Sequence, residues 1–276
     1  MRKISDNKQI QKMEIDILNF VTELCEKNQL TYYLAGGTLL GAIRHNGFIP
    51  WDNDVDIAMP RADYKKLCAL FDNIKNSRYK IYKIEKNNDC YIPFFKIVDS
   101  YTRLYEKTRG IYSDNMGLFI DVFPIDGIEN NEMKSIKKLR RIIKWTYRVT
   151  NCNTFPDELS TKKKMIRVVW YIIFCKILNR EKIFEYLNKK MEEIPFGSTE
   201  YVVSTFGARM EKEIIEYSAF AQIIQVEFEG RMYNAPIGYD KYLTQMYGDY
   251  MKLPPESERV APHDIDVYIK EAEDKY

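Results

Sequence analysis

Apolar positions near the start of the chain are spaced as on one face of a helix. They recur at intervals of three and four residues, which predicts an amphipathic helix with one apolar stripe: Ile10, Met13, Ile17, Val21 and Leu24. Asn28 follows the stripe and is expected to end the helix. This first element is therefore predicted to pack one face against a hydrophobic core.

The next stretch mixes the helical and the strand period. It predicts a strand, a helix, a strand and a helix, in this order, at 31–34, 38–44, 54–59 and 62–71. In the second strand the side chains alternate, so Val55 and Ile57 share one face and Asp54 and Asp56 share the other. That strand is predicted to turn a polar edge toward a site.

Later segments add further strands and a helical region. Strands are predicted at 79–84, 94–98, 103–105, 118–123, 201–204 and 224–228, and a helix at 240–247. The segment 133–191 is helical in pattern and rich in Lys and Arg, with a loop near 151–156. We therefore predict an α+β fold, in which a mixed sheet with flanking helices is interrupted by a basic, largely helical insertion. The expected parts are a catalytic core at 1–132, the insertion at 133–195 and a C-terminal part at 196–276 that packs back on the core.

Composition limits the function classes. The chain has 276 residues, of which 45% are apolar, and can bury a sizeable core. Its five cysteines form no CxxC pair and its two histidines are His45 and His263, which leaves little material for a zinc site or a disulfide framework. The polar N-terminus lacks an apolar signal region, and no apolar run is long enough to span a bilayer. We therefore expect a cytoplasmic protein.

The densest chemical signal is a group of acids that follows a glycine pair. Asp54 and Asp56 lie two residues apart on one strand, so their carboxylates point the same way, and Asp52 precedes them. Such carboxylates repel one another unless a cation lies between them, and oxygen ligands suit Mg²⁺ or Mn²⁺. An acidic turn with solvated charges is the alternative. A third carboxylate is expected on a neighbouring strand.

Asp121 is the candidate for that third carboxylate because it stands inside an otherwise apolar strand. Burial of a lone carboxylate is costly, so Asp121 needs a metal or a partner. The alternative is a strand-end acid paired with a lysine. Asp126, in Pro-Ile-Asp-Gly, is interpreted as a turn residue.

The glycine pair, Gly36-Gly37, precedes the predicted helix that begins at Thr38. Glycine lets the backbone approach a phosphate closely, and the N-terminus of a helix offers N–H donors and a favourable dipole. A glycine pair alone is a weak signal, since such pairs usually form turns.

A long stretch from 33 to 61 carries these residues together: YLAGGTLLGAIRHNGFIPWDNDVDIAMPR. It resembles the signature of the LicD family, bacterial phosphocholine transferases to which the fukutin-type proteins are distantly related. Residues 95–99, 119–127 and 247–255 resemble the same family, so the likeness runs from about 8 to about 263 and is weakest through the basic insertion. Asn53 departs from the pattern, where such proteins commonly carry Asp. The resemblance implies a nucleotidyltransferase-like fold.

The resemblance also implies roles for individual residues. It implies Asp54 and Asp56 as metal ligands, with Asp52 assisting or orienting, and Asp121 as the third carboxylate, either ligand or base. Gly36, Gly37 and Thr38 would hold the nucleotide phosphates. The candidates for neutralising phosphate charge are Arg44, Lys96 and Arg61, with a surface or ion-pairing role as the alternative, which we favour for Arg61.

The implied reaction is attack of an acceptor hydroxyl on a phosphorus of a CDP-linked donor, with release of CMP. The expected donor is CDP-choline and the expected acceptor a sugar of a lipid-linked glycan, as in a cell-surface glycan, teichoic-acid precursor or lipopolysaccharide. Transfer of glycerol or ribitol phosphate and nucleotidyl transfer to a small hydroxylated acceptor are the alternatives. A scaffold without catalytic activity is a further alternative, which an intact metal site would argue against.

The basic insertion has two interpretations. Between Lys134 and Lys190 about sixteen Lys and Arg stand against four acids, and an apolar run at 168–178 lies among them. One interpretation is an interfacial element that meets an anionic membrane surface at the inner face of the membrane. The other, slightly favoured, is a helix buried against the main domain with a solvated basic face. Nucleic acid is not expected as a partner, since no binding motif accompanies the charge.

Overall fold

The computed structural model describes residues 1–74, 77–84, 90, 92–107, 111–113, 116–130, 132–152, 160–204, 206–207, 209–261 and 264–270. His263 and most of the predicted loop at 151–156 lie outside the described residues. The α-helices are α1 (Asn7–Lys27), α2 (Gly36–His45), α3 (Arg61–Asn73), α4 (Glu132–Thr150), α5 (Thr161–Tyr171), α6 (Arg180–Glu192) and α7 (Tyr239–Tyr247). A π-helical segment, η1 (Ile172–Ile177), continues α5, and a short 3-10 turn, η2 (Met210–Glu213), precedes α7.

The predicted first helix is present as α1. The side chain of Asp6 caps its start by accepting a hydrogen bond from the N–H of Lys8 at 3.0 Å, and Asn28 caps its end. Its residues Ile17, Leu18 and Val21 are completely buried. The apolar stripe therefore becomes the contact between α1 and the core of the sheet.

The main sheet is centred on one long strand, β8 (Phe119–Ile128). On one side β8 pairs in parallel with β3 (Asp56–Pro60), which pairs with β2 (Tyr33–Leu34). On its other side β8 pairs antiparallel first with β5 (Phe95–Asp99), the neighbour of β4 (Tyr79–Tyr82), and then with β9 (Tyr201–Val203), the neighbour of β10 (Ile214–Glu216). Strands from all parts of the chain thus meet along β8.

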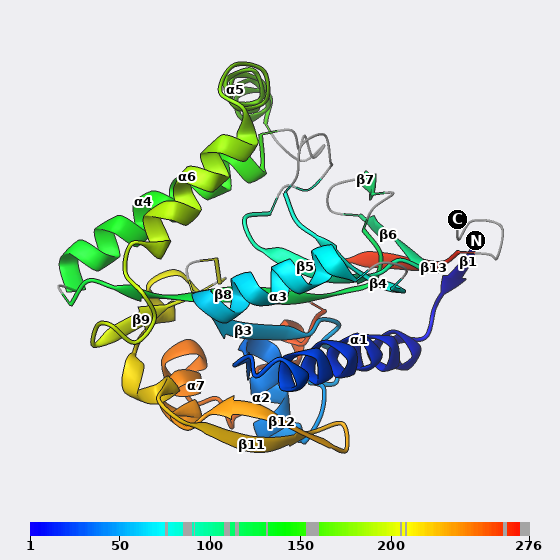
Figure 1. Ribbon diagram of the computed structural model, residues 1–276. Coiled ribbons are helices and arrows are strands. Elements are labelled where there is room, and N and C mark those ends of the chain that lie inside the picture. The colour runs from blue at the N-terminus through cyan, green and yellow to red at the C-terminus, as the bar shows by residue number, and fades with distance from the viewer. Residues whose placement is uncertain are drawn as a thin grey trace.

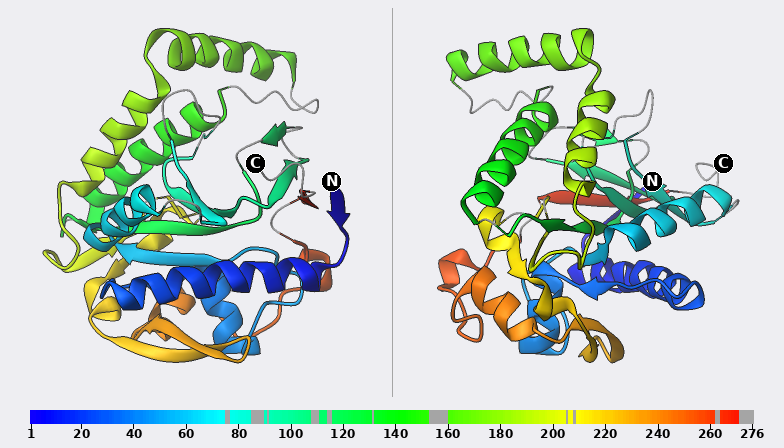
Figure 2. Two further views of the ribbon diagram at one scale, coloured as in Figure 1. Left: turned by 45° about the vertical axis from the view of Figure 1, so that its right-hand side comes forward. Right: turned by 60° about the vertical axis from the view of Figure 1, so that its left-hand side comes forward.

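Two smaller sheets complete the fold. One has the order β1 (Arg2–Ile4), β13 (Ile265–Ile269), β6 (Thr102–Glu106) and β7 (Ile111–Ser113), and the other is a ribbon of β11 (Ile223–Phe228) and β12 (Arg231–Pro236). In Figure 1, α1, α2, α7 and the β11–β12 ribbon lie below strands β3 and β8, whereas α4, α5 and α6 rise above them. Figure 2 shows that α4 and α6 run side by side and that α5 crosses their far end. The prediction of an α+β fold with a mixed sheet is confirmed.

The helices α4 and α6 share a hydrophobic cluster of their own. It contains Leu139 and Ile142 of α4, Phe184 and Leu187 of α6, and Phe174 of η1. It also contains Ile128 and Val203, which join it to the ends of β8 and β9. Along the described part of the chain, none of the helices combines the length and the hydropathy needed to cross a bilayer.

Two details of the predicted elements are wrong. The strand predicted at 54–59 begins only at Asp56, so Asp54 lies in the segment before it and strand alternation does not set its direction. Asp126 is no turn residue: it lies inside β8, which runs five residues further than predicted, and it is completely buried. Its carboxylate binds the Arg61 guanidinium through two hydrogen bonds, at 2.8 and 2.5 Å. This buried ion pair stabilises the continued strand, where the sequence Pro-Ile-Asp-Gly predicts a turn.

Candidate active site

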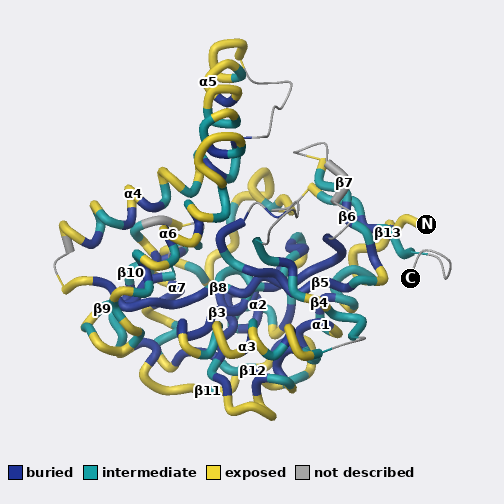
Figure 3. The backbone as a smooth tube through the Cα atoms, turned by 45° about the horizontal axis from the view of Figure 1, so that its top comes forward, coloured by how far each residue is buried: buried dark blue, intermediate teal, exposed yellow. Residues whose placement is uncertain are grey.

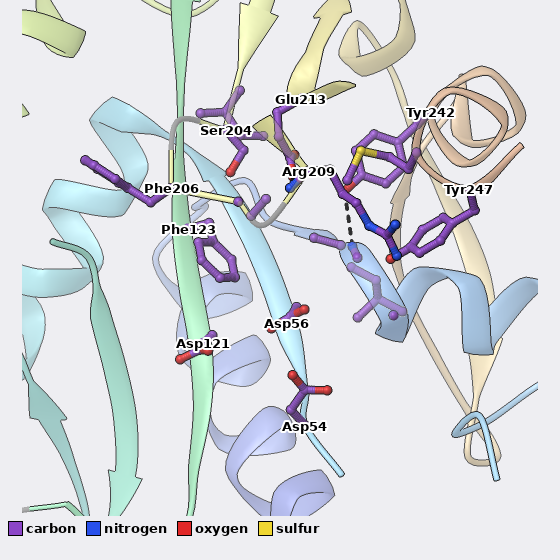
Figure 4. Close-up of a pocket in the computed structure, with 18 of the residues that line it drawn as sticks. Asp54, Asp56, Asp121, Phe123, Ser204, Phe206, Arg209, Glu213, Tyr242 and Tyr247 are labelled. Carbon is purple, nitrogen blue, oxygen red and sulfur yellow. Dashed lines mark hydrogen bonds between the residues drawn. The ribbon is translucent and has the colours of Figure 1, made fainter. Parts of the chain in front are cut away.

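A cavity of about 460 Å³ lies against strands β3 and β8. Asp54, Asp56 and Asp121 line one part of it, and Glu213 and Tyr242 line another (Figure 4). Further walls are contributed by Gly36, Gly37, Trp51, Asp52, Phe123, Phe206, Arg209, Phe220 and Tyr247. The cavity therefore joins an acidic end to an aromatic one.

The two strand carboxylates come together through the sheet register. Asp56 of β3 and Asp121 of β8 are direct partners in the parallel ladder, so their backbones are separated by one strand spacing, about 4.8 Å. Figure 4 shows Asp54 just before Asp56 and Asp121 on the neighbouring strand. The prediction that Asp121 lies on a strand adjacent to Asp56 is thus met by the structure.

The acidic end carries more negative charge than its surroundings offset. Burial, the charge of Asp54 and a hydrogen bond with Asp54 raise the pKa of Asp52 to about 8. Burial, followed by the charges of Asp54, Asp121 and Asp52, raises the pKa of Asp56 well above its usual range, and Lys96 lowers it in part. Carboxyl groups that raise one another's pKa values in this way favour a bound cation, because the cation offsets their negative charge.

Lys96 is the buried cation beside these acids. It is the register partner of Asp121 across β5 and β8, and its Nζ lies 2.5 Å from Asp121 Oδ1. Its ammonium also lies 3.4 Å from the centroid of the Phe119 ring, a cation–π contact. The lysine partner that was the alternative explanation for Asp121 is therefore present, within the same site as the other carboxylates. Lys96 does not line the cavity, so its charge influences the neighbouring acids without direct contact with a ligand.

The glycine pair makes room for carboxylates. A Cβ atom on Gly36 would lie 2.7 Å from Asp56 Oδ2, and one on Gly37 would lie 2.6 Å from Asp52 Oδ2. Gly36 also has a φ of +52°, a conformation that glycine adopts without strain. Both carboxylates thus stand at the N-terminus of α2, whose dipole favours negative charge.

Thr38 and Arg44 were predicted to contact phosphate, and the structure places both away from the cavity wall. The Thr38 hydroxyl accepts a hydrogen bond from the N–H of Asp56 at 2.8 Å and fixes the start of β3. Arg44 donates to the carbonyl of Tyr250 at 2.8 Å and to His45 Nε2 at 2.9 Å. It ties α2 to the segment after α7.

Sequence reasoning missed Glu14. This residue of α1 is 1% exposed, and its Oε2 has no hydrogen-bond partner among the described residues. Burial raises the pKa of Glu14 well above its usual range, with further contributions from Asp54, Asp52 and Asp121. Its position was visible in the sequence, because Glu14 stands four residues after Ile10 and three before Ile17, on the apolar stripe itself.

Sequence reasoning also missed Glu213 and Arg209. Glu213 ends η2, is 5% exposed, lines the cavity and accepts a hydrogen bond from the N–H of Arg209 at 3.2 Å. Burial raises its pKa to about 7. Arg209 is the cationic residue among the described lining residues, and its guanidinium lies 4.6 Å from the Tyr247 ring centroid. Neither has a motif around it, so only the fold reveals them.

The acids suit a divalent metal ion by chemistry and by charge. Their ligand atoms are carboxylate oxygens, the donors that Mg²⁺ and Mn²⁺ prefer, and Asp52 and Asp56 lack cations sufficient to offset them. Among the described residues, no three His, Cys, Asp or Glu side chains already surround a single point. Asp52, Asp54, Asp56 and Asp121 are the residues that would hold the ion.

A mixed sheet with carboxylates on adjoining strands, next to the N-terminus of a helix, is the arrangement of a nucleotidyltransferase-like enzyme. Residues 29–159 match the family model described as "LicD/FKTN/FKRP, nucleotidyltransferase domain". The lipopolysaccharide cholinephosphotransferase LicD of Haemophilus influenzae is 34% identical over 285 residues, which cover 98% of this chain and 100% of that protein. The chain belongs to the LicD family.

A shorter match reaches the animal members of the family. The ribitol 5-phosphate transferases FKRP of mouse and human are each 48% identical over 40 residues, which cover 14% of this chain and 8% of those proteins. The predicted family and the prediction of a phosphotransferase enzyme are therefore confirmed.

Proposed function

We propose that this enzyme transfers phosphocholine from CDP-choline to a sugar hydroxyl of a lipid-linked, cell-surface glycan. The observation that carries the proposal is the cavity, which has a cluster of carboxylates at one end and aromatic rings with a buried carboxylate at the other. The likeness to a lipopolysaccharide cholinephosphotransferase extends over almost the whole chain and supports the same chemistry.

The acidic end is the proposed place of reaction. Asp54, Asp56 and Asp121, with Asp52, would hold Mg²⁺ or Mn²⁺, and such an ion supplies positive charge that offsets the charge on the transferring phosphate. The acceptor hydroxyl forms a new bond to the phosphorus that carries choline, while the bond between this phosphorus and the CMP oxygen breaks. CMP leaves with the bonding electrons. Asp121 is the candidate to take the hydroxyl proton.

Lys96 and Arg209 would assist in different ways. The ion pair with Lys96 fixes the Asp121 carboxylate on β8. Arg209 reaches the cavity itself, so its guanidinium is placed to bind the phosphates of a nucleotide donor. The backbone at Gly36 stands beside the same carboxylates.

The aromatic end suits a quaternary ammonium group. Tyr242 and Tyr247 line the cavity, and burial raises the pKa of both phenols, with a smaller contribution from the negative charge of Glu213. The Arg209 guanidinium lies 4.6 Å from the Tyr247 ring centroid, a cation–π contact of the kind that a quaternary ammonium makes. Ring faces together with a carboxylate are the recognition chemistry of choline.

Transfer of ribitol phosphate or glycerol phosphate is the second candidate. The short match to ribitol 5-phosphate transferases favours it. These donors carry a neutral, hydroxyl-rich group, however, for which the buried carboxylate of Glu213 offers no charge complement. Nucleotidyl transfer to a small hydroxylated acceptor is the third candidate and would release pyrophosphate from a nucleoside triphosphate.

The test is to incubate the enzyme with Mg²⁺ and CDP-choline, CDP-glycerol, CDP-ribitol or CTP, and to measure the released CMP and pyrophosphate. Asp56→Asn serves as the inactive control. We expect CMP from CDP-choline above the other donors. CMP from CDP-ribitol or CDP-glycerol alone would replace the proposal by the second candidate, and pyrophosphate from CTP would replace it by the third.

A further inference from the structure

The helical insertion turns an apolar face outward. Seven apolar side chains of α5, η1 and the residue after them are each between 41% and 69% exposed, and we refer to them as the α5 face: Met165, Ile166, Val168, Val169, Ile172, Ile177 and Leu178. Figure 3 shows α5 as a mostly exposed rod that projects from a body whose central strands, β3 and β8, are buried. No described residue covers this face.

The amphipathic pattern of α5 is inverted. At 100° per residue, Met165, Val169 and Ile172 fall on one side of the helix and Arg167 on the opposite side. Arg167 is the buried residue of α5, whereas those three apolar residues are exposed. A helix that packs on its own domain turns its apolar side inward. The favoured expectation of a buried helix with a solvated basic face is therefore wrong for α5, whose apolar side is exposed within the described part of the chain.

The charges around the α5 face are of one sign. The segment 161–177 contains no Asp or Glu, and Lys162, Lys163 and Lys176 are exposed along it. On the neighbouring α4, Trp145 is 40% and Tyr147 is 55% exposed. Lysines around an apolar strip, with an exposed Trp on the neighbouring helix in contact with Phe174 of η1, are the composition of a helix that lies in the headgroup region of a membrane.

We propose that the α5 face docks on the surface of an anionic lipid leaflet, with α5 lying in the plane of the membrane. The segment is about 25 Å long at 1.5 Å per residue, and it lies at the far end of α4 and α6 from the main sheet (Figure 1), so it reaches a flat surface before the body of the enzyme does. A second copy of the chain fits less well. Two such faces meeting about a twofold axis would bring the lysines of one copy, Lys162, Lys163 and Lys176, toward the lysines of the other.

The test is sedimentation of the full-length enzyme with vesicles of phosphatidylcholine alone and with vesicles that also contain phosphatidylglycerol, at low and high salt. We expect binding to the anionic vesicles that weakens as salt rises. The triple variant Val168→Ser, Val169→Ser, Ile172→Ser and the double variant Lys162→Glu, Lys163→Glu should each lower the partition coefficient by about tenfold or more.

Matched controls are Met232→Ser, an exposed apolar residue of the ribbon, and the pair Lys27→Glu, Lys80→Glu, exposed lysines far from α5 in sequence. Both should bind vesicles as the unaltered enzyme does. Equal and negligible binding to both vesicle types would overturn the proposal. So would a dimer in analytical ultracentrifugation that the triple variant dissociates, since the α5 face would then be an interface between copies.

Discussion

Lys96 and Asp121 face each other across β5 and β8 as register partners, with 2.5 Å between Nζ and Oδ1. The lysine is thereby the buried counter-charge of a site that contains several carboxylates. Because Lys96 and Asp121 pair across two neighbouring strands, a change in either residue alters both the charge of the site and the stability of the sheet.

Replacement of Lys96 by Met should destabilise the metal-free enzyme by about 3–5 kcal/mol, because the buried Asp121 carboxylate would lose its ion pair with Lys96. Added Mg²⁺ should recover part of this loss, since a cation then replaces the ammonium. Urea unfolding with and without Mg²⁺ measures both effects. Lys80→Met, an exposed change on the adjacent strand β4, is the control. An unchanged unfolding midpoint in Lys96→Met would show that the pair contributes nothing.

Asp56→Asn should separate stability from activity. Because burial and the neighbouring acids raise the pKa of Asp56, removing its charge should raise the melting temperature of the metal-free enzyme. The same change should lower turnover by orders of magnitude and shrink the stabilisation by Mg²⁺. Differential scanning fluorimetry and CMP release measure the two properties. Near-normal turnover in this variant would remove Asp56 from the catalytic group.

Glu14→Leu should stabilise the metal-free enzyme by about 1–3 kcal/mol, because the variant removes a buried carboxylate oxygen that has no hydrogen-bond partner among the described residues. We also expect turnover to fall, because that carboxylate would serve the neighbouring acids. Unfolding and CMP release are measured on the same preparation, with Glu26→Leu, a change at an exposed glutamate of α1, as the control. A more stable variant with unaltered turnover would leave Glu14 without a role in the site.

The Michaelis constant for CDP-choline should fall as pH rises through about 7. Burial raises the pKa of Glu213 to about 7, while the backbone N–H and the charge of Arg209 lower this pKa in part. The phenols of Tyr242 and Tyr247 are also ionisable groups near Glu213. Above that pH Glu213 is a carboxylate, which attracts a quaternary ammonium, and below it the group is neutral. Glu213→Gln should abolish the dependence and raise the constant for CDP-choline more than for CDP-ribitol. Parallel pH profiles for both donors in the unaltered enzyme would contradict this.

The sequence predicted the acidic end of the site because its residues lie in short, dense motifs. Asp54 and Asp56 stand two residues apart, and Asp121 was conspicuous as an acid in an apolar strand. The register that makes Asp56 and Asp121 partners could not be derived, since no local pattern specifies which distant strand pairs with which.

The aromatic end of the cavity could not be predicted from the sequence for the same reason. Glu213 and Tyr242 come from a short 3-10 turn and a helix, and they meet the acids only after the chain has folded. The misread Asp126 shows the converse. Turn-forming residues around it were overridden by its buried ion pair with Arg61, a contact between β8 and α3 that the sequence does not show.

The Arg61 pair also reaches the helical insertion. Besides Asp126, the Arg61 guanidinium donates to Asn188 Oδ1 of α6 at 3.1 Å, and the same amide donates to the carbonyl of Pro93 at 3.2 Å. Asp126 lies five residues after Asp121 on one continuous strand. A displacement of α6 would therefore pull on the strand that carries a proposed catalytic acid. Through Arg61, α6 of the insertion is thus linked by side-chain hydrogen bonds to the same strand that carries Asp121.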